Sequence, residues 1–147
     1  MSGLQQLIAI AGRRTDDALA TWQRLRQQCQ DALTKLSLLK QYRERYQEML
    51  HNGLEQGMPV VSTQAYLGFI GQIDDVILRQ ESEVGRIEQA CERQWQLLVE
   101  KRREKRMYEI VGERIASRQL EAAFRRSQAE IDDLLQRVGK PLSGQRA

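Results

Sequence analysis

A chain of 147 residues in which 29% are charged, 5% are aromatic and two are proline has the composition of long helices and coiled coils. The length corresponds to one domain. The sequence contains no run of 18 apolar residues, the length needed to span a membrane. Arg13 and Arg14 follow the first apolar stretch, whereas in a signal peptide the basic residues come before it. The net charge of +3 is uneven: residues 1–92 carry 10 basic and 12 acidic groups and residues 93–147 carry 13 and 8, so the C-terminal part would attract an acidic partner.

The first predicted element is a helix over about residues 3–51. Counted from Leu4 in alternating steps of four and three residues, twelve of fourteen positions are apolar, and Thr15 and Arg43 are the exceptions. The fourteen positions are Leu4, Ile8, Ala11, Thr15, Ala18, Trp22, Leu25, Cys29, Ala32, Leu36, Leu39, Arg43, Tyr46 and Leu50. A period of 3.5 residues held over this length is typical of a coiled coil rather than of a globular amphipathic helix.

The segment HNGLEQGMPVVST breaks this pattern and predicts a turn over about residues 52–62. Its two glycines and its proline are residues that end helices. Either Ser62 or Thr63 is expected to cap the next helix, because a hydroxyl at this place accepts a hydrogen bond from the first helical turn.

The second predicted helix covers about residues 63–138 and repeats the same spacing. Its seam positions are Tyr66, Ile70, Ile73, Ile77, Gln80, Val84, Ile87, Cys91, Gln94 and Leu98. Past Leu98 the pattern decays into the basic run KRREKR, and it reappears in a shifted phase between Leu120 and Val138. The tail, residues 139–147, is expected to fray.

The two seams match one another if the chain folds back on itself at the turn. Leu39 then faces Ile77, and Ala18 faces Leu98. The sequence therefore predicts one all-α domain, an antiparallel two-helix coiled-coil hairpin that is elongated and has an overhanging C-terminal helix. The only cysteines, at 29 and 91, lie on apolar faces without C-x-x-C spacing, so we expect reduced thiols rather than ligands or a bridge.

One edge beside the seam is apolar near the turn, although such heptad positions are normally charged. In an antiparallel pair the g positions of both helices share an edge, and here they are Tyr42, Met49, Phe69 and Val76. The opposite edge carries Lys40, Gln47, Leu67, Asp74 and Glu81. The four apolar residues either widen the seam or form a docking strip for a partner, in which tyrosine is a favoured anchor.

The sequence contains no arrangement of residues that indicates catalysis. It has one histidine, His51, in the predicted turn, and no metalloprotease, phosphate-loop, dinucleotide-binding or nucleophile-elbow motif. Adjacent aspartates such as Asp132 and Asp133 project about 100° apart on a helix, and a two-helix hairpin has no cleft that excludes water. We therefore expect no enzymatic activity, cofactor or metal.

The basic run at residues 101–106 does not have the features of a nucleic-acid reader. Glutamates at 100, 104 and 109 interrupt or flank it, and it lacks both a base-reading asparagine and an aromatic stacking platform. We interpret it as a solvated helix face and expect no nucleic-acid partner.

Two segments resemble one protein family. LLKQYRERYQEML, residues 38–50, is similar to the LL-x-x-Y-x-x-x-Y-x-x-x-L segment of the flagellar FliJ proteins. YLGFIGQIDDVILRQ is similar to that family's Y-x-x-F-I-x-x-L-x-x-A-I-x-x-Q segment, with Ile73 in place of leucine and Val76 in place of alanine. Length, the two-helix plan and a tryptophan followed by a basic helix agree as well.

The resemblance implies a non-enzymatic, stalk-like component of the bacterial flagellar type III protein export apparatus. Members of the family associate with the hexameric ring of the export ATPase (FliI) and promote its activity, and they bind the export gate protein (FlhA) and export chaperones. The resemblance also implies a cytoplasmic protein that associates with the inner membrane only peripherally, through the apparatus.

Carried over position by position, the resemblance assigns gate binding to Lys35, Leu39, Tyr42, Tyr46, Phe69, Ile73, Val76 and Gln80. The stalk-like role and the basic C-terminal part together suggest ATPase contacts at Arg102, Arg103, Arg106, Leu120 and Phe124. Two alternatives stay open: a structural coiled-coil tether without an ATPase partner, and the equivalent stalk of a virulence type III secretion system.

Overall fold

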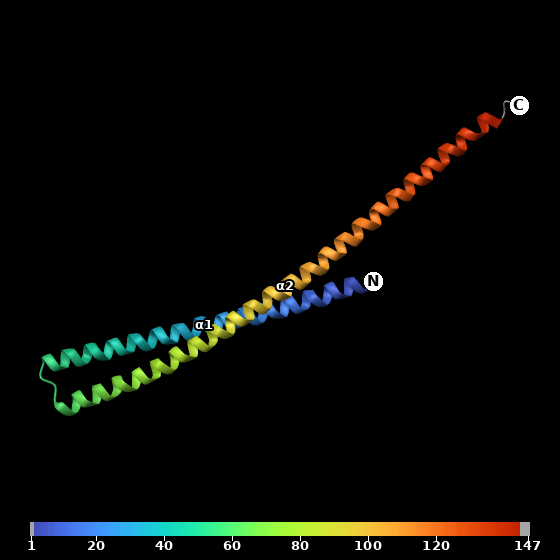
Figure 1. The fold of residues 1–147 in the computed structure, drawn as a ribbon. Helices are drawn as coiled ribbons and strands as arrows, with labels where there is room; N and C mark the ends of the chain where they lie inside the picture. The colour runs from blue at the N-terminus through green and yellow to red at the C-terminus, as the bar shows by residue number, and fades with distance from the viewer. Residues whose placement is uncertain (1, 145–147) are drawn as a thin grey trace. The chain divides into compact units, whose positions relative to one another are not determined.

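The computed structural model describes the backbone of residues 2–144 and the side chains of residues 2–139. These residues form two α-helices, α1 (Gly3–Glu55) and α2 (Val60–Gly144), and they contain no strand (Figure 1). The helices run in opposite directions from a short turn and pack against each other. The predicted all-α helical hairpin is therefore confirmed.

The internal contacts divide the chain into two compact units, each built from both helices. The first, here called the turn unit, is Arg14–Lys101. The second, here called the terminal unit, combines the residues up to Arg13 with those from Arg102 onward. All residues predicted to contact the gate protein belong to the turn unit, and all those predicted to contact the ATPase belong to the terminal unit.

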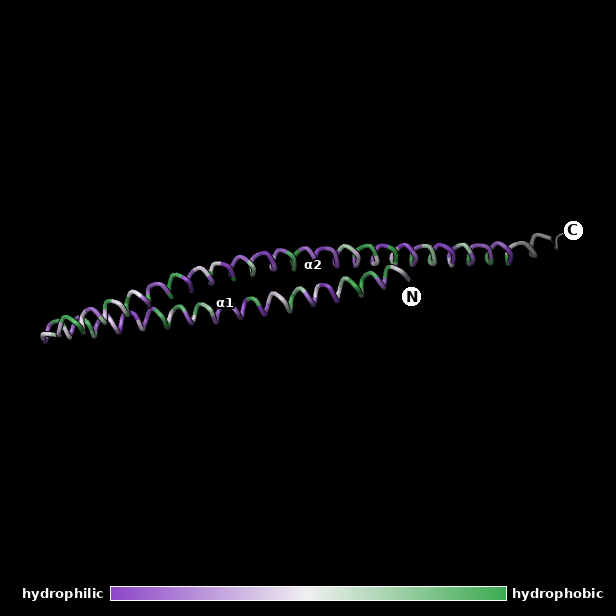
Figure 2. Tube along the Cα trace, turned by 90° about the horizontal axis from the view of Figure 1, so that it is seen from below, coloured by the Kyte–Doolittle hydropathy of each residue, from purple (hydrophilic) through white to green (hydrophobic). Residues whose placement is uncertain are grey.

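The predicted seam forms the core of the turn unit. Every seam position in this unit is buried or half-buried, and Leu98 has no exposed surface at all. Ala32, Val84 and Ile87 form a cluster against which Cys29 and other partly buried residues pack. Figure 2 shows hydrophobic residues recurring at regular intervals along both helices. Burial of this stripe drives the pairing, because each buried leucine or isoleucine contributes about 1.5–3 kcal/mol.

Two glutamines in the seam of α2 donate hydrogen bonds to the backbone of α1. Gln80 Nε2 lies 2.9 Å from the carbonyl oxygen of Ala32, and Gln94 Nε2 lies 3.2 Å from that of Ala18. In both pairs the small alanine side chain lets the amide reach the backbone. These bonds specify the register, since sliding one helix along the other would leave a buried amide without its acceptor.

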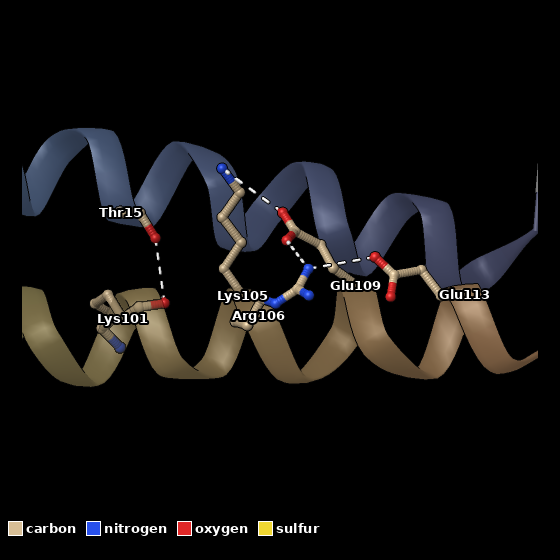
Figure 3. A network of polar contacts seen from close by, with 6 residues as sticks. All are labelled: Thr15, Lys101, Lys105, Arg106, Glu109 and Glu113. Atoms are coloured by element: carbon tan, nitrogen blue, oxygen red, sulfur yellow. Dashed lines mark hydrogen bonds and ion pairs between the residues drawn. The ribbon is translucent and has the colours of Figure 1, made fainter.

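The two polar exceptions in the seam of α1 also have partners on α2. The Thr15 hydroxyl donates to the carbonyl oxygen of Lys101 at 3.2 Å (Figure 3). The Arg43 guanidinium forms an ion pair with the Asp74 carboxylate. The helices therefore remain paired at these two polar positions, because each side chain has a hydrogen-bond or ion-pair partner on the opposite helix.

In the terminal unit the pairing extends farther along α2 than we predicted. The three- and four-residue steps continue through Lys105, Tyr108 and Gly112, which are all half-buried. A Cβ atom at Gly112 would lie 3.5 Å from the Leu4 side chain. The predicted decay of the pattern past Leu98 is therefore wrong, because the methylene stem of a lysine packs like an apolar side chain and a glycine permits close approach.

Past Gln119, the last residue of α2 that lines a depression with the start of α1, the described side chains of α2 have no cover from the rest of the chain. Every side chain from residue 113 to residue 139 is exposed. The shifted apolar stripe is 52% to 78% exposed, at Leu120, Phe124, Ile131, Leu134 and Val138. This part of the terminal unit is a helix whose apolar stripe has no partner among the described residues.

The turn is shorter than we predicted. Gly57 adopts a left-handed conformation with φ of 84°, and it donates to the Leu54 carbonyl while Met58 donates to the Gly53 carbonyl. This pair of bonds is the Schellman motif, and it places the end of α1 at Glu55 rather than near residue 51. Gly53 lies inside the helix, so only one of the two glycines supplies the stop.

The start of α2 also differs from the prediction. The helix begins at Val60, directly after Pro59, so Ser62 and Thr63 lie within its first turn and do not cap it. The backbone N–H of Thr63 donates to the Pro59 carbonyl at 3.0 Å. A proline fits here because the first residues of a helix have no acceptor for their N–H groups.

The C-terminal boundary is later than predicted as well. We expected residues 139–147 to fray, but α2 continues to Gly144, and residues 145–147 lie outside the described part of the chain.

Candidate functional site

The four residues of the predicted apolar edge lie on the surface of the turn unit. Tyr42 and Met49 of α1 are 52% and 45% exposed, and Phe69 and Val76 of α2 are 43% and 40% exposed. The Arg45 guanidinium lies 5.6 Å from the centre of the Tyr42 ring, a cation–π contact. The apolar edge is therefore a surface contributed by both helices near the turn, with apolar area that a partner could bury.

Phe69 also extends the core. Its ring centre lies 4.6 Å from that of Tyr46, and Tyr46 in turn lies 6.3 Å from Tyr66. The rings are tilted by 54° and 53°, and both separations lie within the roughly 4.5–7 Å at which aromatic pairs interact favourably. One side of Phe69 thus widens the seam, whereas Tyr42 makes no aromatic contact with any residue that the structure describes.

The opposite edge is charged and internally neutralised, in accordance with the heptad assignment. Lys40 Nζ lies 3.8 Å from Glu81 Oε1, and both side chains are about half exposed. The neighbouring Asp74 carboxylate accepts from Arg43 and thereby raises the pKa of the guanidinium. These charges already form ion pairs with each other, so they are not free to pair with a binding protein. The apolar edge, in contrast, has exposed apolar surface that a partner could bury.

The other four residues carried over as gate contacts differ in accessibility. Lys35 is exposed and Leu39 is half-buried. Ile73 and Gln80 are each only 9% exposed, and both belong to the core of the hairpin. A partner that docks on the closed hairpin can touch Lys35 directly, whereas substitution of Ile73 or Gln80 would act first on the pairing of the helices.

The basic run in the terminal unit is partly neutralised by glutamates farther along α2. Arg106 Nη1 lies 3.4 Å from Glu109 Oε2 and 3.3 Å from Glu113 Oε1, and Lys105 Nζ lies 4.0 Å from Glu109 Oε1 (Figure 3). Arg102 and Arg103 are exposed. The three arginines of the run therefore form a solvated helix face, whereas Lys101 and Lys105 are half-buried, so the interpretation of the whole run as a solvated face holds only in part.

Leu120 and Phe124 are among the most exposed apolar side chains of the chain. Their exposed fractions are 78% and 69%. They are one helical turn apart and face the same side of α2. Their exposure leaves them accessible to a partner, and no described residue of the terminal unit competes for them.

The described residues contain no group of three or more side chains that could hold a metal ion. Within the same residues, neither helix has a stretch that is long and apolar enough to cross a bilayer.

Comparison with known proteins identifies one family. Residues 1–140 match the family model described as Flagellar FliJ protein. No curated protein and no solved structure matches the chain. The matched range includes both units and both segments that carry the sequence resemblance. The chain therefore belongs to the FliJ family, whose members are components of the flagellar protein export apparatus.

Proposed function

We propose that the chain is the stalk-like component of the export apparatus that binds the export ATPase, promotes its activity, and links it to the export gate protein and export chaperones. Membership of the family supports this role. The observation that carries it is the exposed apolar edge, three of whose four residues are among the positions that the resemblance assigns to gate binding. The proposed location is the cytoplasm, with peripheral association at the inner membrane through the apparatus.

The proposed gate contact consists of the accessible members of the carried-over set. Tyr42 and Phe69 are its anchors, because large aromatic side chains that are buried on binding dominate the free energy of association. Val76 and Lys35 continue the surface away from the turn. Ile73 and Gln80 act through the hairpin itself, since they hold the two helices together.

The proposed ATPase contact lies in the terminal unit. Leu120 and Phe124 supply apolar area, and Arg102 and Arg103 supply positive charge. Charged side chains at such a surface steer association more than they determine affinity. Added salt is therefore expected to slow the association of the chain with the ATPase more than it speeds dissociation.

The gate contact is tested with the double variant Tyr42→Ala with Phe69→Ala. Binding to purified gate protein should weaken by about 2 kcal/mol or more, because each ring is a candidate anchor. The melting temperature should fall only slightly, since Tyr42 is half exposed and Phe69 buries one face alone. Calorimetric binding and thermal melts followed by circular dichroism measure the two quantities.

The matched control is Lys40→Ala with Glu81→Ala, which removes an ion pair from the opposite edge. It should leave gate binding unchanged, because exposed pairs contribute about 0–1 kcal/mol to stability and nothing to the proposed contact. A double variant at the apolar edge that melts lower but binds the gate protein normally would show that the edge is packing. The proposed site would then be wrong.

A further inference from the structure

A second surface of the turn unit is a groove between the helices that the proposed function does not use. It has a volume of about 480 Å³, within the roughly 300–1,000 Å³ range of ligand sites. Trp22, Arg26 and Cys29 line it from α1, and Glu88, Glu92 and Trp95 line it from α2. It is called the tryptophan groove here. It contains both tryptophans of the chain.

The aromatic end of the tryptophan groove already holds one cation. The Trp22 and Trp95 ring centres lie 5.0 Å apart at an interplanar angle of 49°. The Arg26 guanidinium lies 5.4 Å from the centre of the Trp22 ring. Trp95 is 38% exposed, and no cation of the described residues lies over its ring. The pair therefore has one face occupied by a guanidinium and another that is accessible.

The acidic side of the groove has no ion-pair partner among the described residues. Glu88, Glu92 and Trp95 are spaced by four and three residues, so they lie on one face of α2. Among the described residues Glu88 has no hydrogen-bond or ion-pair partner, and Glu92 accepts only from Gln96, at 3.5 Å. Two carboxylates four residues apart repel each other and weaken a helix. The hairpin therefore gains no stability from this charge.

The effect of the charge is visible inside the groove. Burial raises the pKa of the Cys29 thiol, and the Glu88 carboxylate raises it further. The Glu88 carboxylate therefore acts on the Cys29 thiol, which lines the opposite wall of the groove. A positively charged group entering there would meet two carboxylates that have no ion-pair partner among the described residues, beside an indole that is 38% exposed.

We infer that the tryptophan groove is a docking site for an arginine-bearing segment of a partner protein. A guanidinium is planar and donates to carboxylates in a fixed fork while its face stacks on an aromatic ring. The groove offers both features, at Glu88 and Glu92 and at Trp95. This site goes beyond the proposed function and shares no residue with the apolar edge.

The test uses a defined probe on the full chain. The probe is a helical, end-capped alanine-based peptide with two arginines four residues apart, and its comparison peptide has glutamine at the same two positions. Because the chain's two tryptophans both line the groove, their fluorescence reports occupancy directly. The arginine peptide should change the tryptophan emission in a saturable way, and the glutamine peptide should not.

The decisive variant is Glu88→Gln with Glu92→Gln. It should bind the arginine peptide about tenfold more weakly or worse, since hydrogen bonds to charged groups contribute at least that factor. Its melting temperature should not fall, because the change relieves a repulsion. The single variant Glu92→Gln should show an intermediate loss of binding. The dependence of affinity on the number of carboxylates can therefore be measured even if the double variant melts at a lower temperature.

The matched control is Glu44→Gln with Glu48→Gln. This pair has the same spacing on α1 and also lines a surface depression, but that depression contains no tryptophan. Binding should be unchanged in the control. No saturable signal with the arginine peptide, an equal signal with the glutamine peptide, or an equal loss in both glutamate pairs would each overturn the inference. The last result would mean that the peptide follows net charge alone.

Discussion

Gly71 lies in the interior of α2, where an added Cβ atom would meet nothing within 4 Å. A glycine at such a position loses more backbone entropy on folding than alanine does. We predict that Gly71→Ala raises the free energy of unfolding by about 0.5–1 kcal/mol, as measured by urea denaturation followed by circular dichroism. Gly68 has the same open surroundings, so Gly68→Ala should behave alike.

Gly57 is the matched opposite case. It also has open space around it, but its φ of +84° is unfavourable for an alanine. Gly57→Ala should therefore lower the free energy of unfolding by about 1–2 kcal/mol. If Gly71→Ala were destabilising, the outer face of α2 would have to be covered by something that the chain itself does not provide.

Leu97 and Leu98 are neighbours in sequence with opposite surroundings. Leu98 is fully buried, whereas Leu97 is 39% exposed. We predict that Leu98→Ala costs about 2–5 kcal/mol of unfolding free energy, because it opens a cavity at a fully buried position of the seam. Leu97→Ala should cost less than about 1 kcal/mol. Equal losses in urea denaturation would contradict the seam assignment at this level of the hairpin.

At the scale of the helices, the sequence was sufficient to predict which residues pair. A 3.5-residue period assigns one stripe of each helix to the interior, and Ala32, Val84 and Ile87 lie buried together as that period requires. The continuation past Leu98 was missed because Lys105 counts as charged in a hydropathy pattern, although its methylene stem packs in the seam.

Helix boundaries could not be predicted as well, because they depend on one backbone torsion. Gly53 and Gly57 carry the same signal in the sequence, and only the left-handed φ of Gly57 shows which one ends α1. Among the site residues, exposure was the missing quantity. The heptad positions predicted the apolar edge, but they did not predict that the Phe69 ring would pack against the Tyr46 ring of the seam.

The tryptophan groove illustrates what only the paired helices show. Trp95, Glu88 and Glu92 are adjacent on one face of α2, and their spacing in the sequence is sufficient to predict this. That Trp22 of α1 meets Trp95 depends on the register of the hairpin, which brings residues 73 positions apart to within 5.0 Å. A helix face becomes a site here only once the second helix supplies its other wall.

For the molecule as a whole, the two proposed contacts belong to different compact units. The gate surface lies in Arg14–Lys101, and the ATPase surface lies in the unit that contains the remaining residues. Substitutions in one unit should therefore leave the other contact intact, provided that the fold is unchanged. The apolar-edge variant should lose gate binding and retain stimulation of ATP hydrolysis.

Truncation before Leu120 should produce the reverse pattern. The described side chains that it removes are all exposed, so the melting temperature should change by less than about 2 °C. Gate binding should persist, while stimulation of ATP hydrolysis by the purified ATPase should be lost, because the apolar stripe that supplies the proposed contact is gone. Steady-state ATPase assays with increasing amounts of each variant measure this.

Point variants separate the apolar stripe from helix length. Leu120→Ala with Phe124→Ala should reduce the stimulation substantially, since both side chains are exposed and available to a partner. Glu121→Ala with Arg125→Ala removes a surface ion pair of 4.0 Å from the same turns and should leave the stimulation unchanged. Full stimulation by the truncated chain would place the ATPase contact outside residues 120–147. The exposed apolar stripe of α2 would then have no proposed binding partner.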